Sequence, residues 1–170
     1  ISAVLSRNSL DQPIYPSRGS EISLSVALTP PYSAWDGVDY EKASMQEKYS
    51  WIEYYKIKFK SKFFFPLTKD NKLVLMGRAE FGFLGYYDIH KRSPFETFWV
   101  GGDGMSGYSS TYATETVALR GYQNGALTPY YDDGGQAGNI YTRFSIELRY
   151  PIVMKENTMV WVLAFAEAGN

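Results

Sequence analysis

One loop arginine and two strand carboxylates are the residues of this sequence whose types and spacing could form a buried ion cluster. Arg120 lies in the tetrapeptide Leu119-Arg120-Gly121-Tyr122, inside a long segment rich in Gly and Tyr. Glu147 and Glu167 each stand among apolar neighbours in the next two strand-like runs. A guanidinium offers a rigid fork of donors that suits carboxylates. The pattern predicts a loop tucked back against the polar face of a sheet, and the simpler alternative is that Arg120 is a solvated loop cation.

Other groups that could do chemistry are weaker candidates. His90 is the only histidine and the chain has no Cys, which excludes His-rich and thiolate metal sites. The run Asp132-Asp133-Gly134-Gly135 lacks the spaced oxygen ligands of a calcium loop and predicts a plain turn. No helix pattern follows Gly101-Gly102-x-Gly104, so a phosphate site is not expected. We therefore expect no catalytic residues, no metal and no cofactor, and we do not expect an enzyme.

The composition favours a β protein. The chain has 170 residues, enough for one domain, and 17% of them are aromatic, which is typical of strands. Its net charge of −1 gives no electrostatic footprint for nucleic acid. No apolar run reaches the roughly 20 residues of a membrane-spanning helix, although the strands of a membrane barrel need no such run. Ile1 opens directly into a strand-like pattern without a signal peptide, so we expect an interior piece of a longer protein.

Alternation of side chains with a period of two predicts about six antiparallel strands. The clearest run places Lys56, Lys58, Lys60 and Lys62 on one face and mostly aromatic side chains on the other. Four lysines cannot share a dry core without partners. This run alone fits either the exposed face of a soluble sheet or the polar lumen of a barrel. The expected strands are 1–7, 20–29, 51–65, 73–86, 139–151 and 158–169, with the option of a short helix in 40–48 and irregular structure over 87–138.

The lengths of the connections separate the two alternatives. Short and long connections alternate along the chain, and Gly and Pro mark the short ones. Outer-membrane barrels have short turns on the periplasmic side and long loops outside, whereas a soluble sandwich has no reason to sort its loops in this way. Aromatic residues near the expected strand ends fit interfacial girdles. The sequence therefore predicts an all-β fold, an antiparallel transmembrane β-barrel segment.

Several motifs, taken in order, resemble the BamA family of outer-membrane assembly factors. Phe98-Trp99-Val100-Gly101-Gly102 followed by Leu119-Arg120-Gly121-Tyr122 is similar to that family's aromatic-x-x-Gly-Gly and Val-Arg-Gly-Phe signature. Leu119 and Tyr122 replace the commoner Val and Phe, and the gap between Gly102 and Leu119 is longer than in many members. The turn 14–20 and the strand runs 146–151 and 165–169 also match, so the resemblance covers nearly the whole chain.

The resemblance implies a fold, a function and a site. Residues 1–170 would supply part of one barrel of roughly sixteen strands, without the POTRA domains or the remaining strands. The protein would reside in the cell outer membrane and would fold and insert β-barrel clients together with accessory lipoproteins. Arg120 of the signature loop would pair inside the lumen with Glu147 and Glu167. The alternatives are a related polypeptide-translocating pore, of the two-partner secretion or TamA type, and a soluble β-sheet binding module.

Overall fold

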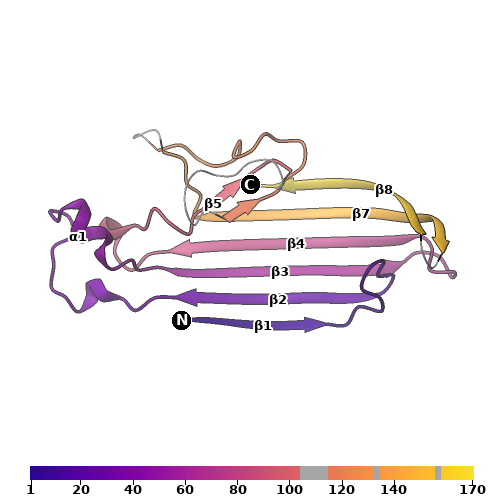
Figure 1. The fold of residues 1–170 in the computed structure, drawn as a ribbon, viewed down its shortest axis with the longest axis horizontal. Coiled ribbons are helices and arrows are strands. Elements are labelled where there is room, and N and C mark those ends of the chain that lie inside the picture. Colours follow the sequence, from indigo (N-terminus) through magenta and orange to yellow (C-terminus); the bar gives the residue numbers. More distant parts are fainter. Residues whose placement is uncertain (104–114, 132–134, 156–157) are drawn as a thin grey trace. The chain divides into compact units, whose positions relative to one another are not determined.

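The computed structural model describes residues 1–103, 115–131, 135–155 and 158–170, and within these ranges the chain is mainly β-strand (Figure 1). Six strands form one sheet in the order β1-β2-β3-β4-β7-β8, and the short strands β5 and β6 pair with each other. The strand bounds are β1 Ser2–Asn8, β2 Gly19–Leu28, β3 Tyr55–Pro66, β4 Val74–Gly85, β5 Phe98–Val100, β6 Glu115–Val117, β7 Ile140–Lys155 and β8 Thr158–Gly169. The short helices are η1 Tyr32–Ala34, α1 Met45–Ser50 and η2 Ile89–Lys91.

The chain divides into two compact units. Unit 1 contains residues 1–4, 25–58 and 82–141, and unit 2 contains residues 5–24, 59–81 and 142–170. Both long connections of the sheet, 29–54 and 86–139, belong to unit 1. The three short connections, 9–18, 67–73 and 156–157, all belong to unit 2. The prediction that short and long connections alternate along the chain is confirmed. The long connections belong to one unit and the short ones to the other.

Strand β7 shows which face of the unit 2 strands is apolar and exposed. The polar side chains Ser145 and Glu147 are 1% and 5% exposed, whereas the intervening Ile146 is 59% exposed. The same face of β7 carries the exposed side chains of Phe144, Leu148 and Tyr150. A continuous row of exposed apolar side chains beside buried polar ones is the reverse of a soluble sheet, and it is the pattern of strands that face lipid.

The opposite face of unit 2 is polar. Lys62 Nζ lies 2.9 Å from the Glu21 carboxylate, and Arg143 lies 3.7 Å from Glu80. A cavity of about 320 Å³ opens among the alternate side chains of β2, β3 and β4. Lys60 and Lys62 line it together with Glu21, Ser23, Arg78 and Glu80, which confirms that this part of the lysine row shares a face with the polar positions of its neighbours; Ser61 also borders the cavity.

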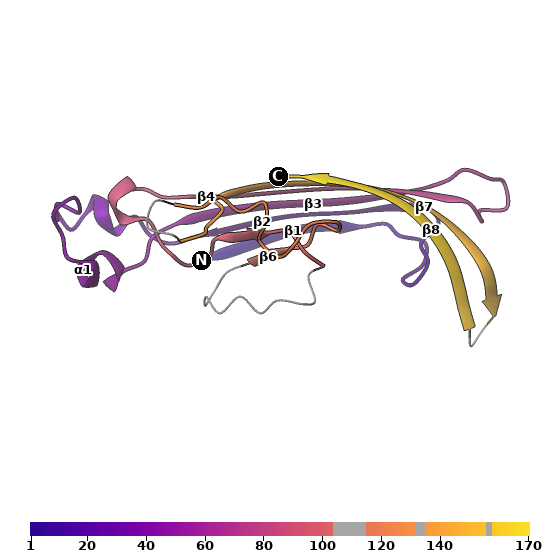
Figure 2. The ribbon, with the colours of Figure 1, turned by 90° about the horizontal axis from the view of Figure 1, so that it is seen from above.

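The structure corrects three of the expected elements. Strand β7 runs on to Lys155 where a turn was expected after Pro151, and Val153 pairs with Val160 beyond a register shift. Proline has no N–H to give the ladder, and a bulge accommodates it without ending the strand. Figure 2 shows β7 and β8 bending together towards the C-terminal end of β7 and the N-terminal end of β8. Strand β3 begins at Tyr55 and not at Trp51. The segment expected to be irregular contains β5 and β6.

The short helix suggested for 40–48 forms later in the chain, as α1. Ser44 and Glu47 form a capping box in which each side chain bonds the other's backbone N–H, and this places the first turn at Met45. Among the described residues, no helix has the length and apolar character needed to cross a membrane.

Candidate functional site

We call the segment from Phe98 to Tyr122, which carries both family motifs, the signature loop. Its base is a two-stranded stem in unit 1 formed by β5 and β6. Strand β5 pairs with β6 in parallel, with Phe98 opposite Glu115. Beyond the stem, the Leu119 N–H donates to the Gly102 carbonyl at 2.9 Å. The two family motifs, which stand far apart in the sequence, are therefore hydrogen-bonded to each other at the point where the loop turns.

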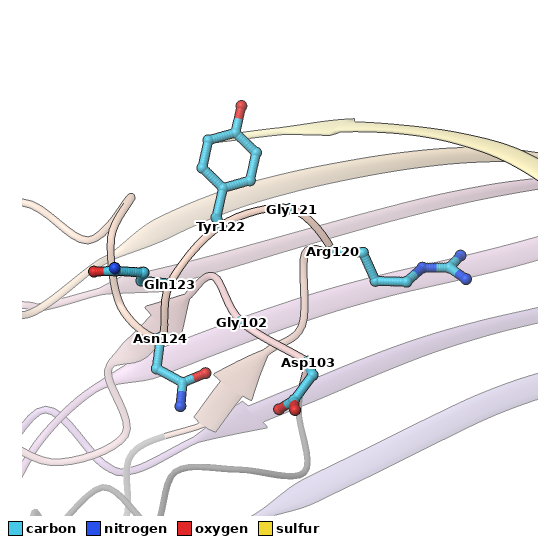
Figure 3. A pocket seen from close by; sticks show the side chains of 7 residues that line it. All are labelled: Gly102, Asp103, Arg120, Gly121, Tyr122, Gln123 and Asn124. Carbon is cyan, nitrogen blue, oxygen red and sulfur yellow. The ribbon is translucent and has the colours of Figure 1, made fainter.

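The tetrapeptide itself makes a turn on this stem (Figure 3). Leu119 is only 1% exposed and anchors the turn, whereas Tyr122 is 49% exposed. Gly121 has φ +93°, a conformation that side chains disfavour, although a Cβ there would meet no atom within 4 Å. Its requirement for glycine is thus conformational. A hollow of about 480 Å³ beside the turn is lined by Gly102, Asp103, Arg120, Gly121, Tyr122, Gln123 and Asn124.

Two strand lysines hold the base of the stem. Lys56, whose side chain is 6% exposed, lies 3.1 Å from both the Glu96 and Glu115 carboxylates. Lys58 Nζ lies 3.0 Å from the same Glu115. Burial raises the pKa of the Glu115 carboxyl, but hydrogen bonds and charge from Lys58 and Lys56 outweigh burial and leave the pKa below its ordinary 4.5. Half of the lysine row therefore binds the signature loop.

An aromatic contact completes the docking of the stem. The rings of Phe98 and Tyr141 meet edge to face, with centroids 4.7 Å apart, and both are almost fully buried. Gly82 on β4 makes room for them, because a Cβ at Gly82 would lie 2.1 Å from the Tyr141 ring. The Lys56 ammonium lies 4.8 Å from the centre of the Phe98 ring. Val100, Val117 and Leu84 close this small core.

A second turn supports the outer side of the stem. The Val100 N–H donates to Thr128 Oγ1 at 2.8 Å, and the Leu127 N–H donates to the Val100 carbonyl at 3.2 Å. Gln136 Nε2 donates to the carbonyl of Thr128 at 3.3 Å. The backbone N–H and C=O of Val100 thus both have hydrogen-bond partners on the side away from β6. Buried backbone groups require such partners.

The two predicted carboxylate partners of Arg120 lie in unit 2. Glu147 accepts hydrogen bonds from Arg149 at 2.7 and 3.0 Å. Glu167 accepts one from Arg143 at 3.0 Å, and its side chain is 2% exposed. Both predicted carboxylates are therefore buried and ion-paired on the polar face. The pairing of Arg120 with Glu147 and Glu167 stays a prediction.

Sequence reasoning missed Glu96 and Glu115 as partners of the loop. The four alternate lysines signalled that carboxylates must face them, but the loop's path decides which ones do. Of the weaker candidates, Asp88 caps η2 by accepting from the His90 backbone N–H at 2.7 Å. Residues 132–134, where a plain turn was predicted, and 104–114 of the long gap lie outside the described residues.

Comparison with known proteins agrees with this geometry. The model of the Omp85 superfamily domain matches residues 1–170. The chain belongs to the Omp85 superfamily. Within this superfamily it is 30% identical over 171 residues to the outer membrane protein assembly factor BamA of Neisseria meningitidis serogroup B, a match that covers 96% of the chain and 17% of that protein. The predicted membership of the BamA family is confirmed.

A solved barrel of the superfamily shows the fold. The crystal structure of BamA from Haemophilus ducreyi lacking POTRA domains 1–3 superposes with a TM-score of 0.67 and 22% identity, over 99% of this chain and 29% of that one. The predicted antiparallel transmembrane β-barrel segment is thereby confirmed. The chain spans less than a third of either relative.

Proposed function

We propose that this chain is part of an outer-membrane protein assembly factor, which folds β-barrel proteins and inserts them into the outer membrane. The observation that carries the proposal is the continuous similarity to an assembly factor over 96% of the chain, including the signature loop. The activity makes and breaks no covalent bond. Its partners are unfolded barrel clients, accessory assembly lipoproteins and the lipid bilayer, and nucleic acid has no role.

In this proposal the chain acts as scaffold and loop clamp. The exposed apolar faces of β7 and β8 contact lipid, and the polar faces line a wet interior. Arg120 of the signature loop pairs there with Glu147 and Glu167. Each carboxylate already binds one arginine, but a carboxylate has about four lone-pair sites and can accept a second guanidinium. A lysine would not replace Arg120 equally, because it lacks the planar fork of donors.

The clamp is tested with full-length protein in cells depleted of the native copy. Arg120→Ala should abolish the heat-resistant gel mobility of the folded barrel, and Arg120→Lys should restore it only in part. Arg18→Ala is the matched control, because Arg18 lies in a short turn and donates to Asn71 at 2.9 Å. Unchanged mobility and viability with Arg120→Ala would refute the clamp.

The same depletion separates an assembly factor from a polypeptide-exporting pore. Loss of an assembly factor should lower the folded amounts of many unrelated outer-membrane barrels at once. Loss of an exporting pore should instead leave one secreted polypeptide in the periplasm while other barrels assemble normally. The second result would overturn the proposed assembly function but would not bear on the pairing of Arg120 with Glu147 and Glu167.

A further inference from the structure

Two segments of unit 1 are joined by two ion pairs in which the order of the charges is reversed. We name residues 91–96, which lead directly into β5, the strap. Glu53, just before β3, is 0% exposed and faces Lys91 of the strap, whose Nζ lies 4.0 Å from the carboxylate. Lys56, three positions later, binds Glu96 of the strap at 3.1 Å. The start of β3 thus supplies one anion and one cation, and the strap supplies their opposites.

The Glu53–Lys91 half of this arrangement is fully enclosed by polar partners. The Lys91 ammonium bonds the Tyr40 hydroxyl at 3.0 Å and lies 4.3 Å from the centre of the Tyr40 ring. The Glu53 carboxylate accepts the Ser33 N–H at 3.0 Å and the Ser33 hydroxyl at 2.6 Å. Tyr40 in turn donates to Asp36. A pair enclosed in this way joins the two long connections, 29–54 and 86–139, inside unit 1.

The reversed charges allow only one register. Sliding the strap so that Lys91 met Lys56 would bring two buried ammonium groups together. Sliding it the other way would bring Glu96 against Glu53. Like charges in a low-dielectric site repel strongly, and a buried ion without its partner is highly unfavourable. The strap is therefore fixed along β3, and so is Phe98, two residues beyond Glu96.

One lysine of β3 binds the chain at the start of both strands of the stem. Lys56 binds Glu96, just before β5, and also Glu115, the first residue of β6, each at 3.1 Å. We propose that the Glu53–Lys91 and Lys56–Glu96 pairs form a reciprocal clamp and that Lys56 is the positioning residue of the signature loop. This inference deepens the proposed function, because it adds to the predicted Arg120 contact a second anchor that acts from the base of the loop.

The test measures exposure of the stem in the full-length, membrane-embedded protein. The chain has no Cys, so Val117→Cys, at a β6 position that is 5% exposed, gives a buried thiol whose maleimide labelling reports undocking. The background carries no other accessible Cys. Lys56→Met should raise the labelling rate roughly tenfold or more, and Lys91→Met should act in the same direction. Heat-resistant mobility must persist, which shows that the barrel itself is assembled.

Two controls separate positioning from general damage. Lys56→Arg keeps the charge and should label at the parental rate. Lys60→Met removes an exposed lysine of the same row and should also have no effect. If Lys56→Met does not assemble, Glu96→Gln weakens one bridge and should still raise labelling severalfold. Parental labelling in assembled Lys56→Met, or in Glu96→Gln and Lys91→Met, overturns the inference. Labelling does not depend on client assembly. Failure of the reciprocal clamp can therefore be told apart from failure of the proposed assembly function.

Discussion

Adding one methyl group at Gly82 should separate the aromatic contact of the stem from ordinary strand packing. A Cβ at Gly82 would lie 2.1 and 2.5 Å from two Tyr141 ring carbons and 2.9 Å from the Phe98 ring. Both rings are almost fully buried, so neither has free space into which to move. Overpacking of this kind typically costs about 1–3 kcal/mol.

Gly77→Ala is the matched control on the same strand. A Cβ at Gly77 meets no atom within 4 Å, and replacing glycine by alanine in a strand otherwise stabilises by about 0.5–1 kcal/mol. The backbone contribution is common to both variants and cancels in their difference. The free energy of unfolding should therefore be lower for Gly82→Ala than for Gly77→Ala by about 1–3 kcal/mol, which is the overpacking cost alone.

The assay is urea unfolding of the full-length protein folded in lipid vesicles and followed by Trp fluorescence. The same pair of glycine variants is also made in a Tyr141→Ala background, where the ring that the new methyl would strike is gone. The space left by Tyr141 also lets the Phe98 ring, 2.9 Å from the new Cβ, move away. The difference between the two variants should therefore shrink in this background, towards the few tenths of a kcal/mol expected of independent sites. Equal stability of the two variants in the parental background, or an undiminished difference without Tyr141, would refute the packing argument.

Two further predictions concern facing and pH. Phe59→Lys should destabilise the barrel by about 2–4 kcal/mol, because it places a charge in lipid, whereas Lys60→Leu on the polar face of the same strand should be tolerated; the reverse ranking in urea unfolding would show that the faces are swapped. The folded-state pKa of Glu115 is lowered, so its contribution to stem docking is complete above its ordinary pKa of 4.5 and is lost as the pH falls through the lowered value. Labelling of Cys at position 117 by a pyridyl disulfide, which unlike a maleimide still reacts with thiols in acid, should therefore rise below pH 4.5 relative to labelling of the unfolded protein at the same pH. A Glu115→Gln variant that keeps the full acid response would show that another group is responsible.

Local patterns in the sequence were sufficient for the architecture. A strand repeats every two residues, so one run of letters shows both the strand and its two faces. Lys60 and Lys62 of β3 and the apolar row from Phe144 to Tyr150 face as their alternation predicted. Strand ends were less certain: Pro151 reads as a terminator, and only the bulge and the pairing with β8 show that β7 continues to Lys155.

The signature loop was recognisable by its motifs, but its attachment was not. Strands β5 and β6 have three residues each, too short for periodicity to reveal, and their parallel pairing depends on chain segments far apart in sequence. The partners of Lys56, Glu96 and Glu115, lie 40 and 59 positions away along the numbering. No local pattern selects them from the 18 acidic residues of the chain.

What the sequence determined by itself was the fold class, the two faces of its strands and the family to which it belongs, because these follow from repeats and motifs between near neighbours. What the tertiary structure alone decided was which opposite charges meet. Ion pairing depends on separation in space, and in unit 1 the path of two long connections brings Glu53 to Lys91 and Lys56 to Glu96.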